Sequence, residues 1–433
     1  MKVYLDTVGC RLNQSEIETY ARQLTAAGHL LVATMEEADL MVLNTCTVTA
    51  AAASDSRQKV RQANKAGIEE IVVTGCLSSV RPDAVAKLPG VVRVVPNQNK
   101  DRLVADLLDI SLDQLEDEEL QRQPVPGSRM RTRAFIKVQD GCNNKCTFCI
   151  TTLARGEGRS RPIHEVVRDV QFALEADVKE VVLTGVHLGS WGKDFSSPQH
   201  LSDLIRHLLA DTDVKRLRVS SMEPWNLDEN FFDLWQDPRL CRHLHLPLQS
   251  GSKTVLRRMA RKTTPGAFAK LVRAARERIP AVAITTDLIA GFPGETEEEF
   301  LEGLDFVESM EFAGAHVFTY SARPGTAAAK MPNQVHNYTR KQRNAALREA
   351  TERSARAYHS RFTGQEAKVL WESAHPIAST SQWHLTGLTD NYLRVQAESE
   401  RPVWNKVTPT QLMSLNQKRM IFEGRISQYP DTI

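Results

Sequence analysis

The stretch that decides the fold is Gln139-Asp-Gly-Cys-Asn-Asn-Lys-Cys-Thr-Phe-Cys-Ile150. Its cysteines, Cys142, Cys146 and Cys149, follow the spacing C-x3-C-x2-C, so three thiols on one short loop can converge on a single metal centre. Three thiolates are one fewer than the four that usually saturate a structural zinc or an iron–sulfur cluster. The spacing therefore indicates a site with an open metal position. A zinc knuckle with a distant fourth ligand is the alternative.

An apolar run from Ala134 to Val138 leads into this loop and predicts a strand. The cysteines would then lie where a strand ends, which is where α/β folds place their ligands. Strands alternating with helical patterns continue to about Arg323. Six parallel strands favour an open or partial TIM-type (β/α)6 barrel over a doubly wound sheet. The further strands are predicted at residues 180–183, 216–219, 244–248, 282–288 and 316–320.

The N-terminal part repeats a strand, loop and helix unit in which each apolar run ends in a cysteine. Runs that begin at Val3, Leu40 and Ile71 lead to Cys10, Cys46 and Cys76, and helical patterns cover residues 13–27 and 51–66. The strands should form a parallel sheet with their carboxyl ends, and hence the three cysteines, at one edge. Alternatively, these cysteines are half-buried residues that pack as small hydrophobes.

The chain is therefore expected to be an α/β protein with several domains. Residues 1–110 form an N-terminal parallel α/β domain, and residues 111–133, with an acidic run and Pro124-Val-Pro-Gly, form a linker. Residues 134–361 form the barrel together with a basic helix at 338–361. That helix is either a phosphate-contacting face or simply a solvated one. Residues 362–428 show strand-like alternation at 367–371, 385–388, 392–395 and 420–424, which fits a small antiparallel β-barrel.

Composition sets broad limits on the class of protein. A chain of 433 residues suggests two or three domains, and 41% hydrophobic with 25% charged residues is typical of a globular protein. The sequence shows no apolar signal core and no apolar run of membrane-spanning length, so we expect a cytoplasmic protein without membrane segments. Seven cysteines, six of them at apparent strand ends, favour ligation over disulfides. The net charge of +2 does not by itself indicate nucleic-acid binding.

With Phe148 just before its third cysteine, the loop resembles the motif of the radical S-adenosylmethionine (SAM) enzymes. The resemblance implies that Cys142, Cys146 and Cys149 hold a 4Fe–4S cluster. Its fourth iron would bind SAM, and an electron from the cluster would cleave SAM to a 5′-deoxyadenosyl radical.

Across essentially the whole chain the sequence resembles the radical SAM methylthiotransferase family, which ends in a TRAM β-barrel. That family would place a second, auxiliary 4Fe–4S cluster on Cys10, Cys46 and Cys76, with a sulfur species on its open iron. Two SAM molecules would serve each turnover, one to methylate the sulfur and one to form the radical. One departure is Ile150-Thr-Thr152, where many members have Ile-Ile-Pro. The matching stretches are 7–14, 44–46, 74–76, 140–149, 154–156, 159–161, 245–252 and 291–296.

Residues at the strand ends of the barrel are the expected SAM contacts, because glycines admit a ligand close to the backbone and polar groups orient it. Phe148 would lie against the adenine of SAM. The other expected contacts are Thr184, Gly185, Ser221, Glu223, Gln249, Ser250, Ile289 and Gly291.

Residues 9–18 and 186–190 resemble the branch that modifies N6-threonylcarbamoyladenosine at position 37, next to the tRNA anticodon. The implied partners are a tRNA anticodon stem-loop and a low-potential electron donor of flavodoxin or ferredoxin type. Arg155, Arg159 and Arg161 could meet the substrate carboxylate or tRNA phosphates, or instead support the loop or the SAM carboxylate. The alternatives are an N6-isopentenyladenosine substrate, an aspartate of a ribosomal protein, and a non-catalytic RNA-binding protein with structural zinc.

Overall fold

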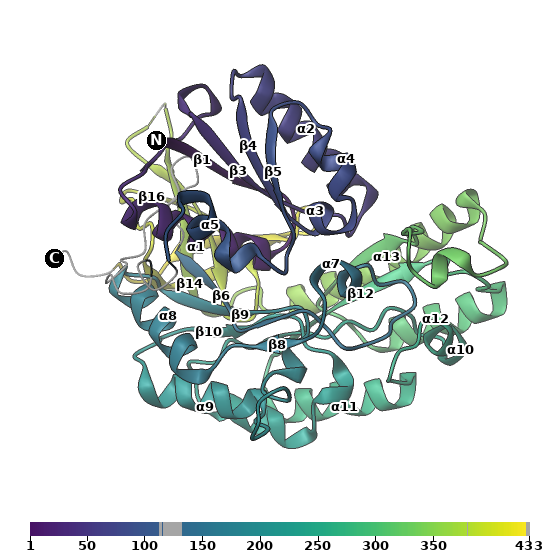
Figure 1. Ribbon diagram of the computed structural model, residues 1–433. Helices are drawn as coiled ribbons and strands as arrows, with labels where there is room; N and C mark the ends of the chain where they lie inside the picture. The colour runs from purple at the N-terminus through teal and green to yellow at the C-terminus, as the bar shows by residue number, and fades with distance from the viewer. Residues whose placement is uncertain (112–114, 116–131, 379, 430–433) are drawn as a thin grey trace.

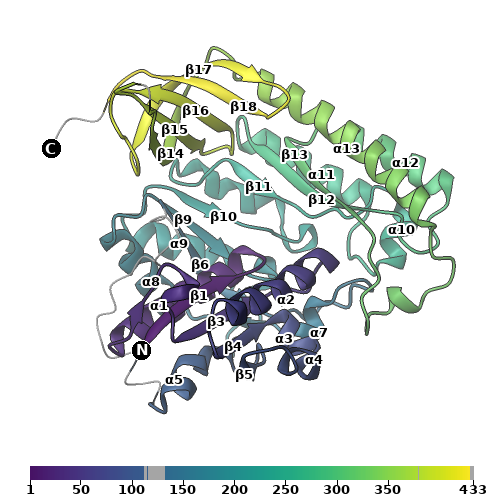
Figure 2. The ribbon, with the colours of Figure 1, turned by 90° about the horizontal axis from the view of Figure 1, so that it is seen from above.

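The computed structural model describes residues 1–111, 115, 132–378 and 380–429, and has three parts (Figure 1). An N-terminal sheet with its helices lies over a central barrel, and a second, closed barrel follows at the C-terminal end. Seen from above, the C-terminal barrel and the N-terminal sheet lie on different sides of the central strands (Figure 2). The predicted linker 111–133 lies almost entirely outside the described residues.

The N-terminal part is a parallel sheet in the strand order β2-β1-β3-β4-β5, as the repeated units predict. Its central strand is buried along its whole length, because helices cover both faces. Side chains of α1 pack on one face and those of α2 on the other. Two strands, β2 and β5, are additional to the predicted ones. The strands are β1 (Lys2–Thr7), β2 (Leu30–Leu31), β3 (Leu40–Thr45), β4 (Glu70–Gly75) and β5 (Val91–Val95).

The helices of this part follow the apolar periodicity closely. Helices predicted at 13–27 and 51–66 correspond to α1 and α2, and each begins one or two residues earlier than predicted. After β5 the chain forms a 3-10 turn, η2, followed by the short helix α5. The elements are α1 (Arg11–Ala26), α2 (Ala50–Lys65), α3 (Cys76–Val80), α4 (Pro82–Ala86), η2 (Lys100–Arg102) and α5 (Leu103–Leu108).

The central part consists of parallel sheets β10-β9-β6 and β11-β12-β13. Bridges from Leu217 to Leu240 and from Ser221 to His245 join them into the predicted partial barrel. The strands are β6 (Arg133–Lys137), β9 (Glu180–Thr184), β10 (Leu217–Val219), β11 (His243–His245), β12 (Ala283–Ala290) and β13 (Gly314–Thr319). The elements between and around them are β7 (Gln139–Asp140), α7 (Thr151–Arg155), β8 (Arg159–Ser160), α8 (Ile163–Glu175), α9 (Leu201–Asp211), α10 (Lys253–Arg258), α11 (Pro265–Arg278) and α12 (Glu297–Ser309).

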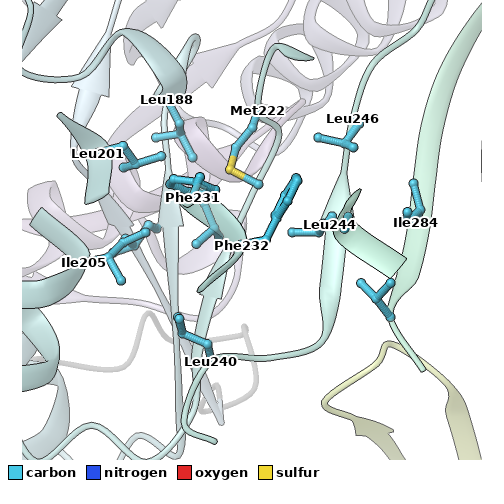
Figure 3. Close-up of a cluster of buried hydrophobic side chains, with 14 of the residues drawn as sticks. Leu188, Leu201, Ile205, Met222, Phe231, Phe232, Leu240, Leu244, Leu246 and Ile284 are labelled. Atoms are coloured by element: carbon cyan, nitrogen blue, oxygen red, sulfur yellow. The ribbon is translucent and has the colours of Figure 1, made fainter. Parts of the chain in front are cut away.

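A hydrophobic cluster inside the central part fixes where β10 and β11 end (Figure 3). Phe231 and Phe232, on the 3-10 segment η5 (Glu229–Gln236), pack among side chains of α9, β11 and β12. Phe232 is fully buried, and burying a side chain of this size contributes roughly 1.5–3 kcal/mol. This packing holds the carboxyl ends of the strands, which carry the polar side chains, at one rim.

The C-terminal part is a closed barrel in the strand order β14-β15-β16-β18-β17. The β16–β18 pair is parallel, whereas the alternation pattern suggested an antiparallel barrel throughout. The parallel pair arises because β18 returns from the β17–β18 hairpin in the direction of β16. β17 is additional to the predicted strands. The strands are β14 (Glu366–Pro376), β15 (Trp383–Thr389), β16 (Arg394–Ser399), β17 (Val407–Asn416) and β18 (Ile421–Ile426).

The basic helix α13 (Asn337–Ser360) has a largely structural role. Arg343 is buried and pairs with Glu295 at 2.9 Å and with Glu297 at 2.8 Å. Arg353 pairs with acidic residues as well, and so do Arg356 and Arg361. Lys341 and Arg348 of the same helix are exposed, so the phosphate-contacting face of α13 stays a prediction.

A buried carboxylate helps to dock the C-terminal barrel on the central one. Glu180 accepts hydrogen bonds from Arg216 and Arg218, which also donate to backbone carbonyls of the C-terminal barrel. Burial alone would raise the pKa of Glu180, but Arg218 and Arg216 hold that pKa well below its usual range. The turn after β15 then brings Tyr392 toward the rim of the central barrel. Among the described residues, no helix has the length and apolar character to cross a bilayer.

Candidate functional site

A cavity of about 930 Å³ lies where the three parts of the protein meet. Its wall includes the first residues of α1, the loop before α7, the strand ends of the central barrel and residues of the C-terminal barrel. The six cysteines predicted as ligands all line it: Cys10, Cys46, Cys76, Cys142, Cys146 and Cys149. Residues far apart in the sequence thus share one chamber.

We call Cys142, Cys146 and Cys149 the loop triad. N–H groups lie within hydrogen-bonding distance of the three sulfurs. The backbone N–H of Asn144 donates to the Cys142 sulfur at 3.4 Å, and that of Thr151 donates to the Cys149 sulfur at 3.4 Å. A guanidinium nitrogen of Arg261 lies 3.9 Å from the Cys146 sulfur. Such hydrogen bonds stabilise thiolates that ligate a cluster and tune its potential.

Cys10, Cys46 and Cys76, called here the strand-end triad, are brought together by the parallel sheet. Cys10 precedes the first residue of α1, Cys46 follows β3, and Cys76 begins α3 directly after β4. Asn13 connects two of these loops, because its side-chain amide donates to the carbonyl of Val8 at 2.9 Å and to that of Thr45 at 3.1 Å.

Glycines with positive φ precede a cysteine three times. Gly9 has φ 121°, Gly75 has φ 97° and Gly141 has φ 68°. A Cβ on Gly75 would lie 2.4 Å from the Thr45 carbonyl oxygen, and one on Gly141 would lie 1.8 Å from the Glu157 carbonyl oxygen. Only glycine fits these positions, so it decides the direction in which the following cysteine points.

The donor chemistry of both triads fits an iron–sulfur cluster. Each site offers three thiols and leaves a position open, and soft thiolates are the usual ligands of such clusters. Burial raises the pKa of Cys46 to about 11 and also raises the pKa of Cys142, and a bound metal would reverse this effect by favouring the thiolate. Among the described residues, no three His, Cys, Asp or Glu side chains surround one point as the ligands of a single ion would.

A buried cluster of charges lies between the two triads. Arg155, at the end of α7, pairs with Glu16 and with Asp140, each at 3.0 Å, and donates to Asn13 at 2.6 Å. Lys100 joins the same two carboxylates. Burial would raise the pKa of Glu16, but Arg155 and Lys100 lower it to about 2. The cluster therefore ties α1 of the N-terminal part to the loop-triad segment through ionised groups.

A direct contact also joins the peptide segments that carry the triads. Helix α3, which begins at Cys76, packs against α7, which follows Cys149. Asn97 donates to the carbonyl of Ala154 at 2.8 Å and lies 3.7 Å from the sulfur of Cys76. The peptide segments that carry the two triads are therefore in direct contact.

The three arginines predicted beside the loop triad have different environments. Arg155 is buried in the charged cluster. Arg161 pairs with Glu165 at 3.1 Å and with Asp169 at 2.7 Å, so it supports the start of α8. Arg159, on the short strand β8, is exposed. Neither Arg155 nor Arg161 is placed to receive a substrate carboxylate.

Most of the expected SAM contacts line the cavity, and three do not. Ser250 is buried and accepts a backbone N–H from Ser252. Ile289 packs in the cluster that also holds Phe148, and a Cβ on Gly291 would lie 2.2 Å from a side-chain carbon of Arg340. These three residues thus lie behind the wall. Those that line the cavity are Phe148, Thr184, Gly185, Ser221, Glu223 and Gln249.

Further cavity residues were not singled out from the sequence. The hydroxyl of Thr285 lies 2.9 Å from both His243 and His245, and His245 lies 3.2 Å from Asp287. Burial holds the pKa of His243 well below its usual value, so this ring is neutral. The ends of β11 and β12 could have indicated these residues. Nothing in the local sequence indicates that Tyr392 of the C-terminal barrel lines this cavity. Its backbone has a positive φ of 69°.

Comparisons with known proteins agree with this architecture. Residues 136–307 match the model of the Radical SAM superfamily, and residues 2–96 match that of Uncharacterized protein family UPF0004. The chain is similar to the solved structure of the radical SAM methyltransferase TsrM from Kitasatospora setae, with a TM-score of 0.59 and 18% identity over 76% of this chain and 75% of that one.

Two relatives match over most of their length. The threonylcarbamoyladenosine tRNA methylthiotransferase MtaB of Bacillus subtilis (strain 168) is 35% identical over 95% of this chain and 93% of its own. The tRNA-2-methylthio-N(6)-dimethylallyladenosine synthase of Caldicellulosiruptor saccharolyticus is 34% identical over 85% of this chain and 81% of its own. Membership of the radical SAM superfamily implies a 4Fe–4S cluster and SAM. The chain belongs to the radical SAM methylthiotransferase family.

Proposed function

We propose that the protein is a tRNA methylthiotransferase that attaches a methylthio group to C2 of N6-threonylcarbamoyladenosine at position 37, beside the anticodon. The observation that carries this proposal is the single cavity lined by both cysteine triads. A chamber with two open cluster sites suits the combination of radical formation and sulfur transfer on one substrate atom.

In this proposal each triad holds a 4Fe–4S cluster. Bound at these sites, the clusters and SAM supply a radical able to break an unreactive C–H bond and a methylthio group to replace the hydrogen. Side-chain acids and bases are unsuited to this step because the hydrogen is not acidic, so the protein supplies binding and orientation. Glu223, which pairs with Arg261 at 2.6 Å, lines the cavity together with Thr184 and Gly185, and these residues would orient SAM.

The polarity of the wall supports the threonylcarbamoyl substrate. His243, His245, Thr285 and Tyr392 line the cavity, together with Asn391 from the C-terminal barrel. A threonylcarbamoyl group has amide, hydroxyl and carboxylate groups that can form further hydrogen bonds with such side chains, whereas an isopentenyl group offers none. Four of the relatives with 33–36% identity also have names that refer to threonylcarbamoyladenosine.

The partners follow from the same chemistry. Arg394 and Arg419 are exposed cavity residues of the C-terminal barrel and would meet RNA phosphates. A low-potential flavodoxin or ferredoxin would supply electrons, two SAM molecules would be used in each turnover, and the reaction would take place in the cytoplasm with tRNA.

Mass spectrometry of tRNA nucleosides from a deletion strain tests the proposal. The 2-methylthio derivative of N6-threonylcarbamoyladenosine should disappear while its unmethylthiolated precursor accumulates. Retention of the derivative would contradict the proposal, and loss of the isopentenyl derivative instead would reassign the substrate.

Metal analysis of the anaerobically reconstituted protein tests the cofactors separately. About eight irons and eight sulfides per chain are expected if both triads hold clusters. About four irons would leave one triad without a cluster, and zinc without iron would favour a non-catalytic RNA-binding protein.

A further inference from the structure

The described residues that line the cavity include five arginines, and they differ in how their charge is balanced. Arg155 and Arg261 are buried and pair with carboxylates. Arg394 and Arg419 are exposed, so solvent screens their charge. Arg11 is only partly exposed, and no carboxylate of the described chain pairs with it.

The guanidinium of Arg11 is nevertheless held in place. It donates to the Tyr392 hydroxyl at 2.5 Å, and its central carbon lies 5.7 Å from the ring centre of Phe135 and 5.8 Å from that of Tyr392. His243 stacks on Tyr392 with ring centres 4.3 Å apart and an interplanar angle of 13°. Side chains from the central part and from the C-terminal barrel therefore hold this cation of the N-terminal part at the cavity wall.

The two other arginines near Tyr392 each have a carboxylate partner. Burial would raise the pKa of Tyr392, but Arg11, Arg133 and Arg218 lower it. Arg218 pairs with Glu180 at 2.7 Å, and Arg133 lies 4.0 Å from the same carboxylate. Arg11 is therefore the arginine beside Tyr392 that has no carboxylate partner among the described residues.

A partly buried, oriented guanidinium without a counter-charge is well suited to binding an anion. Its planar fork matches a carboxylate, and removing it from water has a cost that a bound anion offsets. Arg11 also follows Cys10 directly, so a group bound to it would lie beside the strand-end triad.

We propose that Arg11, positioned by Tyr392, binds the carboxylate of the threonyl group on the N6 position of the substrate adenosine. This assignment rests on the proposed function and extends it to a specificity-determining residue, because the isopentenyl group is uncharged. SAM also carries a carboxylate, so the test has to separate these two sources.

The test measures binding of anticodon stem-loop RNA to the anaerobic holoenzyme by fluorescence anisotropy. Three RNAs are compared, with N6-threonylcarbamoyladenosine, its methyl ester, or unmodified adenosine at position 37. The wild type should prefer the free carboxylate over the ester by at least ~10-fold, as expected for a charge-assisted hydrogen bond. In Arg11→Gln this preference should fall to about one, with the affinity for unmodified RNA unchanged.

Two further variants separate recognition from general effects. Arg394→Gln, which removes an exposed arginine of the same cavity, should weaken all three RNAs alike and keep the preference for the carboxylate. Tyr392→Phe removes the hydroxyl that orients Arg11 and should reduce the preference only in part. Each variant is used at iron and sulfide contents equal to wild type, and Arg11→Met, which is also uncharged, replaces Arg11→Gln if the latter does not reach them.

The outcomes distinguish the two proposals. An Arg11 variant that keeps the wild-type preference overturns the inference, and so does one that weakens SAM binding while the preference persists. A wild type that methylthiolates the threonylcarbamoyl RNA without preferring the carboxylate overturns the inference but not the proposed function. A wild type that does not methylthiolate this RNA overturns both. Support requires loss of the preference together with a raised KM for the RNA.

Discussion

Cys142, Cys146 and Cys149 lie on one loop after a single strand, whereas Cys10, Cys46 and Cys76 come from three strand ends of another domain. The two triads line the same cavity. In both of them a cysteine follows a glycine at a position where a Cβ would clash. They differ in what brings their thiols together. For the loop triad it is the covalent chain, and for the strand-end triad it is the correct pairing of β1, β3 and β4. Damage to the N-terminal sheet should therefore remove one site and spare the other.

Replacing one cysteine of each triad in turn should have the largest effect and tests whether the two triads have separate roles. Cys146→Ala should abolish SAM cleavage, because the ligand set for the SAM-binding cluster is lost. Cys46→Ala should keep SAM cleavage and lose methylthiolation entirely. Release of 5′-deoxyadenosine and the yield of methylthiolated RNA measure the two activities, and iron content should fall from about eight to about four per chain in either variant. Equal loss of SAM cleavage in both variants would contradict separate roles.

Gly75→Ala should damage the strand-end triad selectively. Its φ of 97° with ψ −163° is a region that essentially only glycine adopts, and its Cβ would lie 2.4 Å from the Thr45 carbonyl oxygen. We expect the free energy of unfolding to fall by ~3 kcal/mol or more, and iron to fall to about four atoms per chain.

Gly67→Ala is the matched control for Gly75→Ala, since Gly67 has φ 100° and open space around its Cβ position. It should cost only about 1–2 kcal/mol and leave the iron content unchanged. Similar iron loss in both variants would show that backbone strain, rather than the contact with Thr45, matters.

Arg155→Met should weaken the connection between the triads. It leaves Glu16 and Asp140 buried with Lys100 as their remaining cation, which should lower the free energy of unfolding by about 3–5 kcal/mol. Arg353→Ala is a suitable control, because Arg353 also pairs with two glutamates but is 51% exposed. It should cost less than about 1 kcal/mol in the same denaturant titration. Equal costs would rule out the buried cluster as a major connection.

Replacing the seventh cysteine, Cys241, should have the smallest effect on stability and iron content. Cys241 is buried, its thiol lies 3.7 Å from Glu180, and burial raises its pKa to about 12. Because it lies in neither triad, Cys241→Ala should retain full iron content and methylthiolation and cost about 1 kcal/mol of stability. Loss of iron in this variant would contradict the division of the cysteines into two triads and one packed residue.

The sequence predicted elements best where the signal is local. Strands that end in cysteine and helices with regular apolar spacing occur close to their predicted positions, because periodicity is set by neighbours along the chain. β2 has only two residues, too few to show a pattern, whereas the apolar run of the edge strand β5 was not recognised as a strand. Within the basic run of α13, charge counting does not reveal that Glu295 and Glu297 lie opposite Arg343.

Local sequence also does not determine which single residues among the expected SAM contacts reach the cavity. Thr184 and Gln249 reach the cavity, whereas Ser250 does not, although it follows Gln249 directly. Which of two neighbours faces a ligand depends on the path of the loop after a strand. That path is set here by φ 78° at Gln249, a conformation that the residue type does not predict.

The sequence by itself determined the loop triad, the alternation of strands and helices, and the likeness to radical SAM enzymes, because these depend on spacing along the chain. Tertiary structure alone decided that both triads face one cavity, that Arg155 is a buried connection rather than a substrate contact, and that Tyr392 meets Arg11. These features join residues from different domains. Their energies come from burial and charge pairing across the interfaces, which no local pattern records.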